Sequence, residues 1–258
     1  MSIVAWDVRG LGNRDIVRAL KDVISKLYGS FYVDPQGLAS GLALWWIADV
    51  QIGVIRESSN FIDVSVSVTG EEGWFFTFIY GLPYREEKHQ FWKNLSSLGN
   101  DHFSRWCVLG DTNIISNQSE KEGGNSVDNS QIGWFYEFLD STRLLDLPIK
   151  GGTFTWSNMR CDDEAIVEKL DRILISNEWS LKFPKAIEIL EAAIASDHNP
   201  IVLLLEGLKK EGKKSLNLNH DGSLKMIALL KLERLGTIRF LVPAQMSLLR
   251  SLRPLDLE

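Results

Sequence analysis

The sequence predicts an α/β protein built from two packed mixed sheets with helices on the outside. Apolar runs of strand length recur along the chain. Their connections are of two kinds, short turns typical of hairpins and amphipathic segments typical of helices. The 9 Trp and 12 Phe side chains supply bulk for a core. Strand pairs joined both by hairpins and by helices favour two sheets stacked on one another with helices outside.

The first predicted strand, residues 3–6, is a short apolar run that ends at Asp7. Asn13 can cap a helix over residues 14–26, because the apolar side chains of this segment share one face. A strand-rich block follows, and it comprises residues 42–46, 50–54, 61–68 and 74–80. The last two of these runs flank a Gly-Glu-Glu-Gly turn and are predicted to form a hairpin.

Helices and strands alternate through the second half of the pattern. The predicted elements are a helix at 85–98, a strand at 105–109, a loop at 115–129, a helix at 131–141, strands at 153–156 and 169–175, a helix at 178–183 and a strand at 201–205. The coherent pattern ends near Glu206. We therefore predict a domain at residues 1–206. Residues 207–258 are predicted to begin with a lysine-rich linker and to include an amphipathic helix at 226–235, without assigned chemistry.

The bulk composition limits the classes of function. The chain of 258 residues has a net charge of −6, so it lacks the basic footprint of most nucleic-acid binders, and any DNA contact must use a local patch. Cys107 is predicted in the core and Cys161 in a polar loop, and two cysteines favour a reducing compartment. Asp7 and Arg9 interrupt the first apolar stretch, which opposes a signal peptide, and no apolar run has the length of a membrane span. We expect a protein of the nucleus or cytoplasm.

Two short polar motifs lie next to predicted buried strands. Gly110-Asp111-Thr112-Asn113 follows the apolar run 106–109, and Ser196-Asp197-His198 precedes the apolar run 201–205. Open α/β sheets bind ligands at strand ends. An Asp, an Asn and a His at one rim can hold a divalent cation, orient a phosphate and activate water. The pair of motifs therefore indicates a site that cleaves phosphodiesters.

Seven segments, taken in order, resemble one known family. They are Trp6–Gly12 with Val17–Leu20, Gly37–Leu44, Phe78–Gly81, Gly110–Asn113, Gly152–Asn158, Leu170–Arg172 and Ser196–His198. This ordered set resembles the endonuclease/exonuclease/phosphatase superfamily with its DNase I-like fold. Within it, the set is most similar to the reverse-transcriptase-associated endonuclease domain of plant non-LTR (LINE-type) retrotransposons. The resemblance covers most of residues 1–206 and implies a four-layer α/β sandwich that acts on DNA.

The resemblance also implies a role for each matching residue. Asp111 matches the group that aligns or deprotonates the attacking water, and Asn113 matches its partner, which orients the phosphate. His198 matches the group that contacts the phosphate oxygen as charge builds, and Asp171 matches the carboxylate that orients this His. Tyr80 matches a hydroxyl donor at the phosphate. Mg²⁺ or Mn²⁺ is the implied cofactor.

Two departures from the family pattern concern the metal. The family has Asn where this chain has Asp7. It also has an apolar strand ending in Glu-Thr, whose Glu is the main metal ligand. Here Lys26 runs almost directly into a segment that resembles a later part of the pattern. We therefore predict that one strand is deleted and that metal binding is weakened, since Mg²⁺ needs near-ideal octahedral oxygen ligands. The predicted metal ligands are Asp7, which can compensate for the missing Glu, Asp111 and Asp197.

Several of these residues also have purely structural interpretations. Tyr80 can be a core residue, and Asp171 can pair with Arg172, although adjacent residues on a strand face opposite ways. The segment 155–157 is interpreted as packing. The remaining histidines have no motif around them and are predicted at the surface: His89, His102 and His220.

The sequence leaves three functions open. The first is Mg²⁺-dependent nicking of DNA by a monomeric enzyme without a membrane partner. The second is a catalytically inactive remnant of a retrotransposon endonuclease, which the missing Glu strand favours. The third is hydrolysis of phosphomonoesters, because the superfamily also contains phosphatases.

Overall fold

The structure is a computed structural model that describes residues 2–6, 29–34, 42–46, 50–67, 73–102, 104–192, 196–205 and 224–230. For residues 2–4, 6 and 224–230 it describes the backbone alone. Four sequence-based predictions fall outside the described residues: the site residue Asp7, the helix at 14–26, the lysine-rich linker that begins at residue 207 and the surface position of His220.

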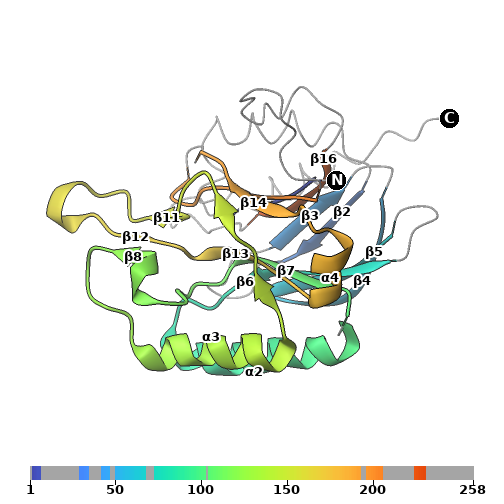
Figure 1. The fold of residues 1–258 in the computed structure, drawn as a ribbon, viewed down its shortest axis with the longest axis horizontal. Helices are drawn as coiled ribbons and strands as arrows, with labels where there is room; N and C mark the ends of the chain where they lie inside the picture. The colour runs from blue at the N-terminus through green and yellow to red at the C-terminus, as the bar shows by residue number, and fades with distance from the viewer. Residues whose placement is uncertain are drawn as a thin grey trace.

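Two mixed sheets stack on one another, as predicted (Figure 1). The six-stranded sheet has the order β4 (Gln51–Ser58), β5 (Phe61–Ser67), β6 (Trp74–Tyr80), β7 (Trp106–Asp111), β13 (Asp171–Ile175) and β9 (Leu145–Asp146). The seven-stranded sheet has the order β10 (Ile149–Lys150), β14 (Ile187–Leu190), β15 (Ile201–Leu204), β1 (Ser2–Trp6), β16 (Leu224–Leu230), β3 (Leu42–Trp46) and β2 (Gly29–Val33). A small third sheet joins β11 (Trp156–Ser157), β12 (Val167–Glu168) and β8 (Lys121–Glu122).

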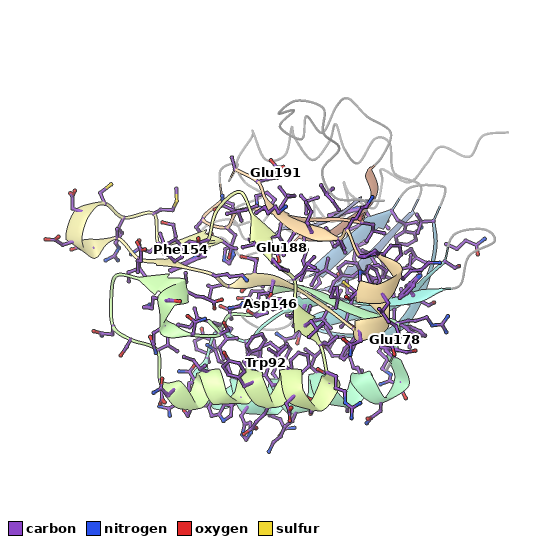
Figure 2. The ribbon with its side chains drawn as sticks, viewed as in Figure 1. Trp92, Asp146, Phe154, Glu178, Glu188 and Glu191 are labelled. Carbon is purple, nitrogen blue, oxygen red and sulfur yellow. The ribbon has the colours of Figure 1, made fainter. Side chains whose placement is uncertain are left out.

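Two long helices cover the outer face of the six-stranded sheet (Figure 1). They are α2 (Arg85–His102) and α3 (Asn129–Thr142), and Trp92 of α2 points toward the sheet (Figure 2). Asp128 caps α3 by accepting a hydrogen bond from the backbone N–H of Ser130. The shorter helical elements are α4 (Asn177–Lys182), η1 (Gln118–Glu120) and η2 (Asp162–Glu164). No helix in the described part of the chain has the length and apolar character needed to cross a membrane.

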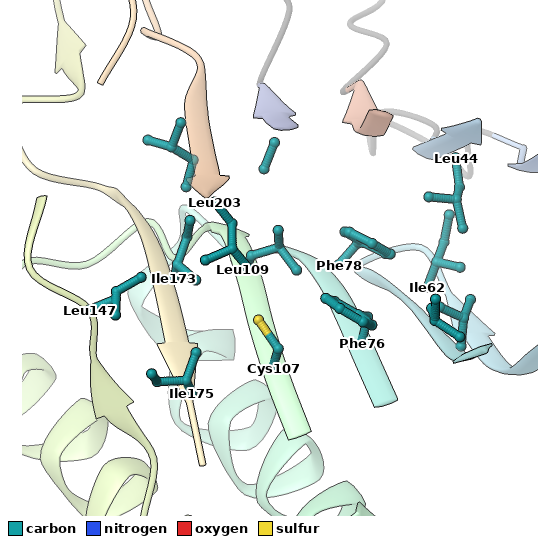
Figure 3. Packing of buried hydrophobic residues seen from close by; sticks show 14 of the residues in the cluster. Leu44, Ile62, Phe76, Phe78, Cys107, Leu109, Leu147, Ile173, Ile175 and Leu203 are labelled. Atoms are coloured by element: carbon teal, nitrogen blue, oxygen red, sulfur yellow. The ribbon is translucent and has the colours of Figure 1, made fainter. Parts of the chain in front are cut away.

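The main core lies between the two sheets and follows the two-residue period of the strands (Figure 3). Its central side chains are fully buried, and they include Phe76, Phe78, Cys107, Leu109, Ile173 and Leu203. Burying one such aliphatic or aromatic side chain stabilises the fold by about 1.5–3 kcal/mol. Cys107 is therefore a core residue, as predicted, and Cys161 is exposed.

The sheet position between β1 and β3 is filled by β16, which runs parallel to β1 and antiparallel to β3. The helix predicted at 226–235 is therefore wrong at residues 226–230. A strand at this position pairs with backbone groups of both neighbours, and that gain outweighs a helical periodicity in the sequence. The domain boundary at residue 206 stays a prediction, and β16 is an element of this sheet that lies beyond it.

One histidine predicted at the surface is buried. His102 is the last residue of α2, which extends four residues beyond its predicted end at residue 98. Its Nε2 lies 2.8 Å from Oδ2 of the fully buried Asp63, and its ring stacks on Phe75. A buried carboxylate needs a partner, and the packed helix end supplies one. The sequence hid this pair because the two residues are 39 positions apart.

Candidate functional site

Three polar side chains stand in a row at the ends of three neighbouring strands of the six-stranded sheet. Tyr80 pairs with Asp111 in the parallel register of β6 and β7, and Asp111 pairs with Asp171 in the antiparallel register of β7 and β13. The alternate residues of these strands, such as Phe78, Leu109 and Ile173, pack in the core between the sheets. The row is therefore the continuation of that core face, where hydrophobic residues give way to polar ones.

His198 joins this row from the opposite sheet. It precedes β15, and its Nδ1 lies 2.9 Å from Oδ2 of Asp171. Both side chains are about 2% exposed. An ionised Asp171 accepts a hydrogen bond, so it selects the imidazole tautomer with the proton on Nδ1 and fixes the orientation of the ring.

Asn113 and Asp111 hold each other at the end of β7. The backbone N–H of Asn113 donates to Oδ1 of Asp111 at 2.7 Å, and Nδ2 of Asn113 donates to Oδ2 at 2.8 Å. The same Nδ2 donates to the carbonyl of Gly81 at 2.6 Å. Asn113 adopts a left-handed backbone conformation with φ 50°, which Asn tolerates better than most residues. The Gly-Asp-x-Asn turn thus holds the carboxylate of Asp111 and the side-chain amide of Asn113 next to each other.

Two glycines allow the strand ends to approach each other this closely. Gly110 has φ 134°, and a Cβ at this position would lie 2.2 Å from the carbonyl oxygen of Ile79. A Cβ at Gly81 would lie 2.3 Å from the carbonyl oxygen of Thr112. Any other residue would push β6 away from the Asp111 turn.

The segment before β11 braces the site from the side. Oγ1 of the buried Thr155 accepts hydrogen bonds from the backbone N–H groups of Leu170 and Asp171, each at 2.9 Å. Nε1 of Trp156 donates to Oδ2 of Asp197 at 2.8 Å. A pocket of about 710 Å³ opens beside these groups, and it is lined by Trp156, Asn158, Met159, Arg160, Ile166, Ser196 and Asp197. The segment was interpreted as packing alone; the structure gives it contacts that orient Asp171 and Asp197.

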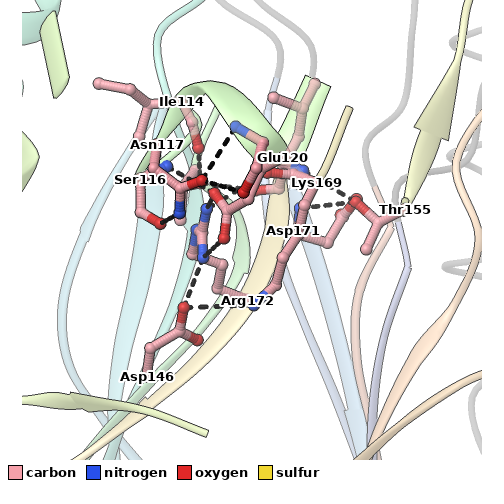
Figure 4. Close-up of polar contacts among 12 residues, drawn as sticks. Ile114, Ser116, Asn117, Glu120, Asp146, Thr155, Lys169, Asp171 and Arg172 are labelled. Carbon is pink, nitrogen blue, oxygen red and sulfur yellow. Dashed lines mark hydrogen bonds and ion pairs between the residues drawn. The ribbon is translucent and has the colours of Figure 1, made fainter. Parts of the chain in front are cut away.

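Arg172 points to the opposite side of β13 from Asp171 and anchors the loop that follows the Asp111 turn (Figure 4). Its guanidinium pairs with Glu120 and Asp146, so the expectation that Asp171 and Arg172 face opposite ways is confirmed. Burial alone would raise the pKa of Glu120, but its hydrogen bond with Arg172 and the charge of Arg172 bring that pKa below its ordinary value. Glu120 in turn accepts the backbone N–H of Ser116 at 2.6 Å. The loop that contains Ser116 and Glu120 is thus tied to β13 through the ion pairs of Arg172.

The structure brings most of the predicted site residues to one place. Asp111, Asp171 and His198 each offer a ligand atom within 4.8 Å of the others, and Asn113 and Tyr80 adjoin Asp111. Asp197 is bonded to Trp156 and is not a member of this three-residue group. Its role as a metal ligand stays a prediction, as does that of Asp7.

The donor set fits a divalent cation. Two buried carboxylates that adjoin without a neutralising cation repel each other, and carboxylate oxygens are the ligands that Mg²⁺ and Mn²⁺ prefer. Nδ1 of His198 is already engaged with Asp171, which leaves the carboxylates as the better ligands. Asp111 is therefore the residue most suited to hold the ion.

Thr155 was interpreted as packing, and its hydrogen bond to the backbone of Asp171 was not predicted. One residue that shapes the site was missed from the sequence. It is Lys88, in the first turn of α2, whose Nζ donates to the carbonyl of Asn113 at 2.7 Å. A signal for Lys88 was present, because it lies three, four and seven positions before Phe91, Trp92 and Leu95, on the apolar face of the helix.

Comparison with known proteins establishes the fold. No family model and no curated protein matches the sequence. Among solved structures, the endonuclease domain of TRAS1, a telomere-specific non-LTR retrotransposon, superposes with a TM-score of 0.62 at 12% identity, over 81% of this chain and 99% of that domain. The 3′ phosphatase NExo from Neisseria, bound to a product DNA hairpin, has a TM-score of 0.55 at 17% identity, over 79% and 98%. Truncated TDP2 from Caenorhabditis elegans has a TM-score of 0.51 at 15% identity, over 78% and 96%. The chain shares the DNase I-like fold of these structures.

Proposed function

We propose that this chain hydrolyses phosphodiester bonds in DNA with the help of a divalent cation, and that by ancestry it is an endonuclease of the LINE type. The observation that supports this is the convergence of Asp111, Asn113, Asp171 and His198, which come from two distant motifs and the strand between them. A phosphodiester is an anion, and nucleophilic attack adds to its charge. A hydrolytic site therefore needs an oriented water, hydrogen-bond donors toward the phosphate and a cation.

Asp111 and Asn113 are assigned to the attacking water. The hydrogen bonds of Nδ2 on Asn113 go to Asp111 and to the carbonyl of Gly81. The atom that Asn113 can offer to a ligand is then Oδ1, an acceptor, and an acceptor suits a water better than a phosphate oxygen. Asn113 would hold the water while Asp111 takes its proton. The expectation that Asn113 orients the phosphate requires the amide to leave these two acceptors.

His198 is assigned to the phosphate. Because Asp171 engages Nδ1, the ring nitrogen that can donate to a phosphate oxygen is Nε2. The carboxylate of Asp171 also stabilises the positive imidazolium that such a donor needs. The hydroxyl of Tyr80, which adjoins Asp111 in the sheet register, is proposed as a second donor.

The cation would be held by Asp111 together with Asp7 and Asp197, and the bound ion offsets negative charge on the phosphate and on the carboxylates. Mg²⁺ and Mn²⁺ both accept such oxygen ligands. We propose that Asp7 compensates for the missing Glu of the family. If it does, Asp7→Asn binds Mg²⁺ more weakly in a calorimetric titration; equal affinity would refute the compensation.

Nicking of supercoiled plasmid in Mg²⁺ tests the proposal. The wild-type chain should nick, and Asp111→Asn should lower kcat by about 10²–10⁴-fold, as for loss of a general base. Asp140→Asn changes an exposed carboxylate of α3 in the same way and should leave the rate unchanged. An Asp111→Asn variant that nicks as fast as the wild-type chain would contradict the assignment.

Two other functions are separated when this assay is combined with an assay of phosphate release from phosphomonoesters. A folded chain that neither nicks nor releases phosphate in Mg²⁺ or Mn²⁺ would be the inactive remnant, which the predicted loss of the Glu-bearing strand favours. A chain that releases phosphate from phosphomonoesters but never nicks would be a phosphatase. We also propose that the chain is a monomer of the nucleus or cytoplasm, and sedimentation of the purified protein tests the monomer.

A further inference from the structure

Lys88 is a buried lysine at the start of α2. It is about 9% exposed, and its neighbours on the same helix face are Phe91, Trp92 and Leu95. Lysine is almost never this buried unless its ammonium group has a partner, because removing the charge from water is costly. The position of Lys88 therefore needs a reason beyond helix packing.

The partner of Lys88 is the backbone of the candidate site. Its Nζ donates to the carbonyl of Asn113 at 2.7 Å, and within the described part of the chain Lys88 forms no ion pair with a carboxylate. Burial lowers the pKa of Lys88 from its ordinary value, and the nearby charge of Asp111, followed by that of Glu168, opposes this. The carboxylate that acts most strongly on the buried ammonium is thus Asp111.

The carbonyl that Lys88 holds belongs to Asn113, a residue that three other hydrogen bonds also hold. Asn113 is left-handed, and its N–H and side-chain amide are both bonded to Asp111. A third hydrogen bond of Asn113 runs from its Nδ2 to the carbonyl of Gly81. Lys88 supplies the fourth hydrogen bond, and among the described contacts of Asn113 it is the only one that comes from a helix. Without it, the carbonyl of Asn113 loses its partner and the residue can turn away from Asp111.

We propose that Lys88 is a positioning residue of the site. It holds the carbonyl of Asn113, so that the residue keeps the orientation in which its side-chain amide stays on Asp111, and it places a positive charge near the carboxylate of Asp111. The catalytic part of this inference rests on the proposed hydrolysis, whereas the positioning of Asn113 does not.

Three variants separate positioning from a purely structural role. Lys88→Met keeps the length and packing of the side chain but removes the charge and the donor, and Lys88→Arg keeps both. Lys93→Met makes the same change at an exposed position of the same helix and is the matched control. If Lys88→Met does not fold, Lys88→Gln, which keeps a neutral donor, replaces it with the same expected direction.

The first readout is hydrogen exchange of the backbone N–H of Asn113, measured by NMR on the protein without metal. This N–H donates to Asp111, so its exchange rate reports how well Asn113 is held against Asp111. In Lys88→Met it should exchange about ten- to a hundredfold faster, the range expected for losing a bond to a charged donor, while core amides such as that of Leu109 keep their protection. In Lys88→Arg, which keeps the charge and the donor, the N–H of Asn113 should exchange as slowly as in the wild-type chain.

The second readout is nicking. Lys88→Met should lower kcat about tenfold or more with KM for DNA unchanged, because a mispositioned Asn113 affects the reacting water and not DNA binding. If Asn113 exchange in Lys88→Met equals that in Lys93→Met, or if Lys88→Arg fails to restore it, the proposal is wrong. If exchange changes as expected but even the wild-type chain never nicks, positioning holds and the proposed hydrolysis fails.

Discussion

At the scale of the residue, the site is defined by the hydrogen bonds that orient its side chains. Asp171 holds His198, Thr155 holds the backbone of Asp171, and Asn113 holds Asp111. The first two bonds are buried and the third is partly buried, so each is stronger than its equivalent in water and each removal leaves a shielded polar atom without compensation. The chemistry proposed for the site depends on these orientations as much as on the residue types.

Another buried carboxylate, that of Glu188, leads to a prediction about how stability depends on pH. Glu188 of β14 lies inside the molecule (Figure 2), and its two side-chain oxygens form no hydrogen bond with the residues that the structure describes. Burial raises the pKa of Glu188 well above its ordinary value of 4.5, and the positive charge of Lys169 opposes this only in part. The neutral form is therefore the one that fits the folded protein.

We expect the free energy of unfolding to fall with rising pH because of this residue. A raised folded-state pKa gives stability that is fully present below about pH 4.5, the unfolded value, and is lost as the pH rises through the folded value. Glu188→Gln imitates the neutral acid, so its denaturation midpoint should depend less on pH than that of the wild-type chain. Glu178→Gln, an exposed change on α4, is the control (Figure 2). Parallel pH curves for the wild-type chain and Glu188→Gln would contradict the burial of an uncompensated acid.

At the scale of the element, β16 carries the most informative prediction. It pairs with β1 on one side and β3 on the other, so its removal leaves two strands with unpaired backbone groups. Each buried unsatisfied group costs about 1–3 kcal/mol, and a domain has only about 5–15 kcal/mol of stability in total.

A chain truncated after residue 206 should therefore lose several kcal/mol in urea denaturation or fail to fold. A chain truncated after residue 235 keeps β16 and should retain most of its stability, so it serves as the matched control. Equal stability of the two truncated chains would show that β16 does not complete the sheet.

At the scale of the whole molecule, the sequence pattern predicted the elements that depend on residues close together in the chain. The hairpin of β5 and β6, the amphipathic helices α2 and α3 and the two polar turns at Asp111 and His198 were all visible in short windows of sequence. The pairing of β16 with β1, the burial of His102 against Asp63, and the contact of Lys88 with Asn113 depend on residues that are distant in the sequence. No periodicity encodes such contacts, because they arise only when separate elements pack.

The most direct test of the account is whether its two distant motifs act as one unit. Plasmid nicking should be measured for Asp111→Asn, His198→Ala and the double variant. If the groups serve a single transition state, the double variant loses no more of kcat than the more damaging single variant, since residues of one catalytic unit are strongly non-additive. If the two losses multiply, Asp111 and His198 act independently, and a shared hydrolytic site is contradicted.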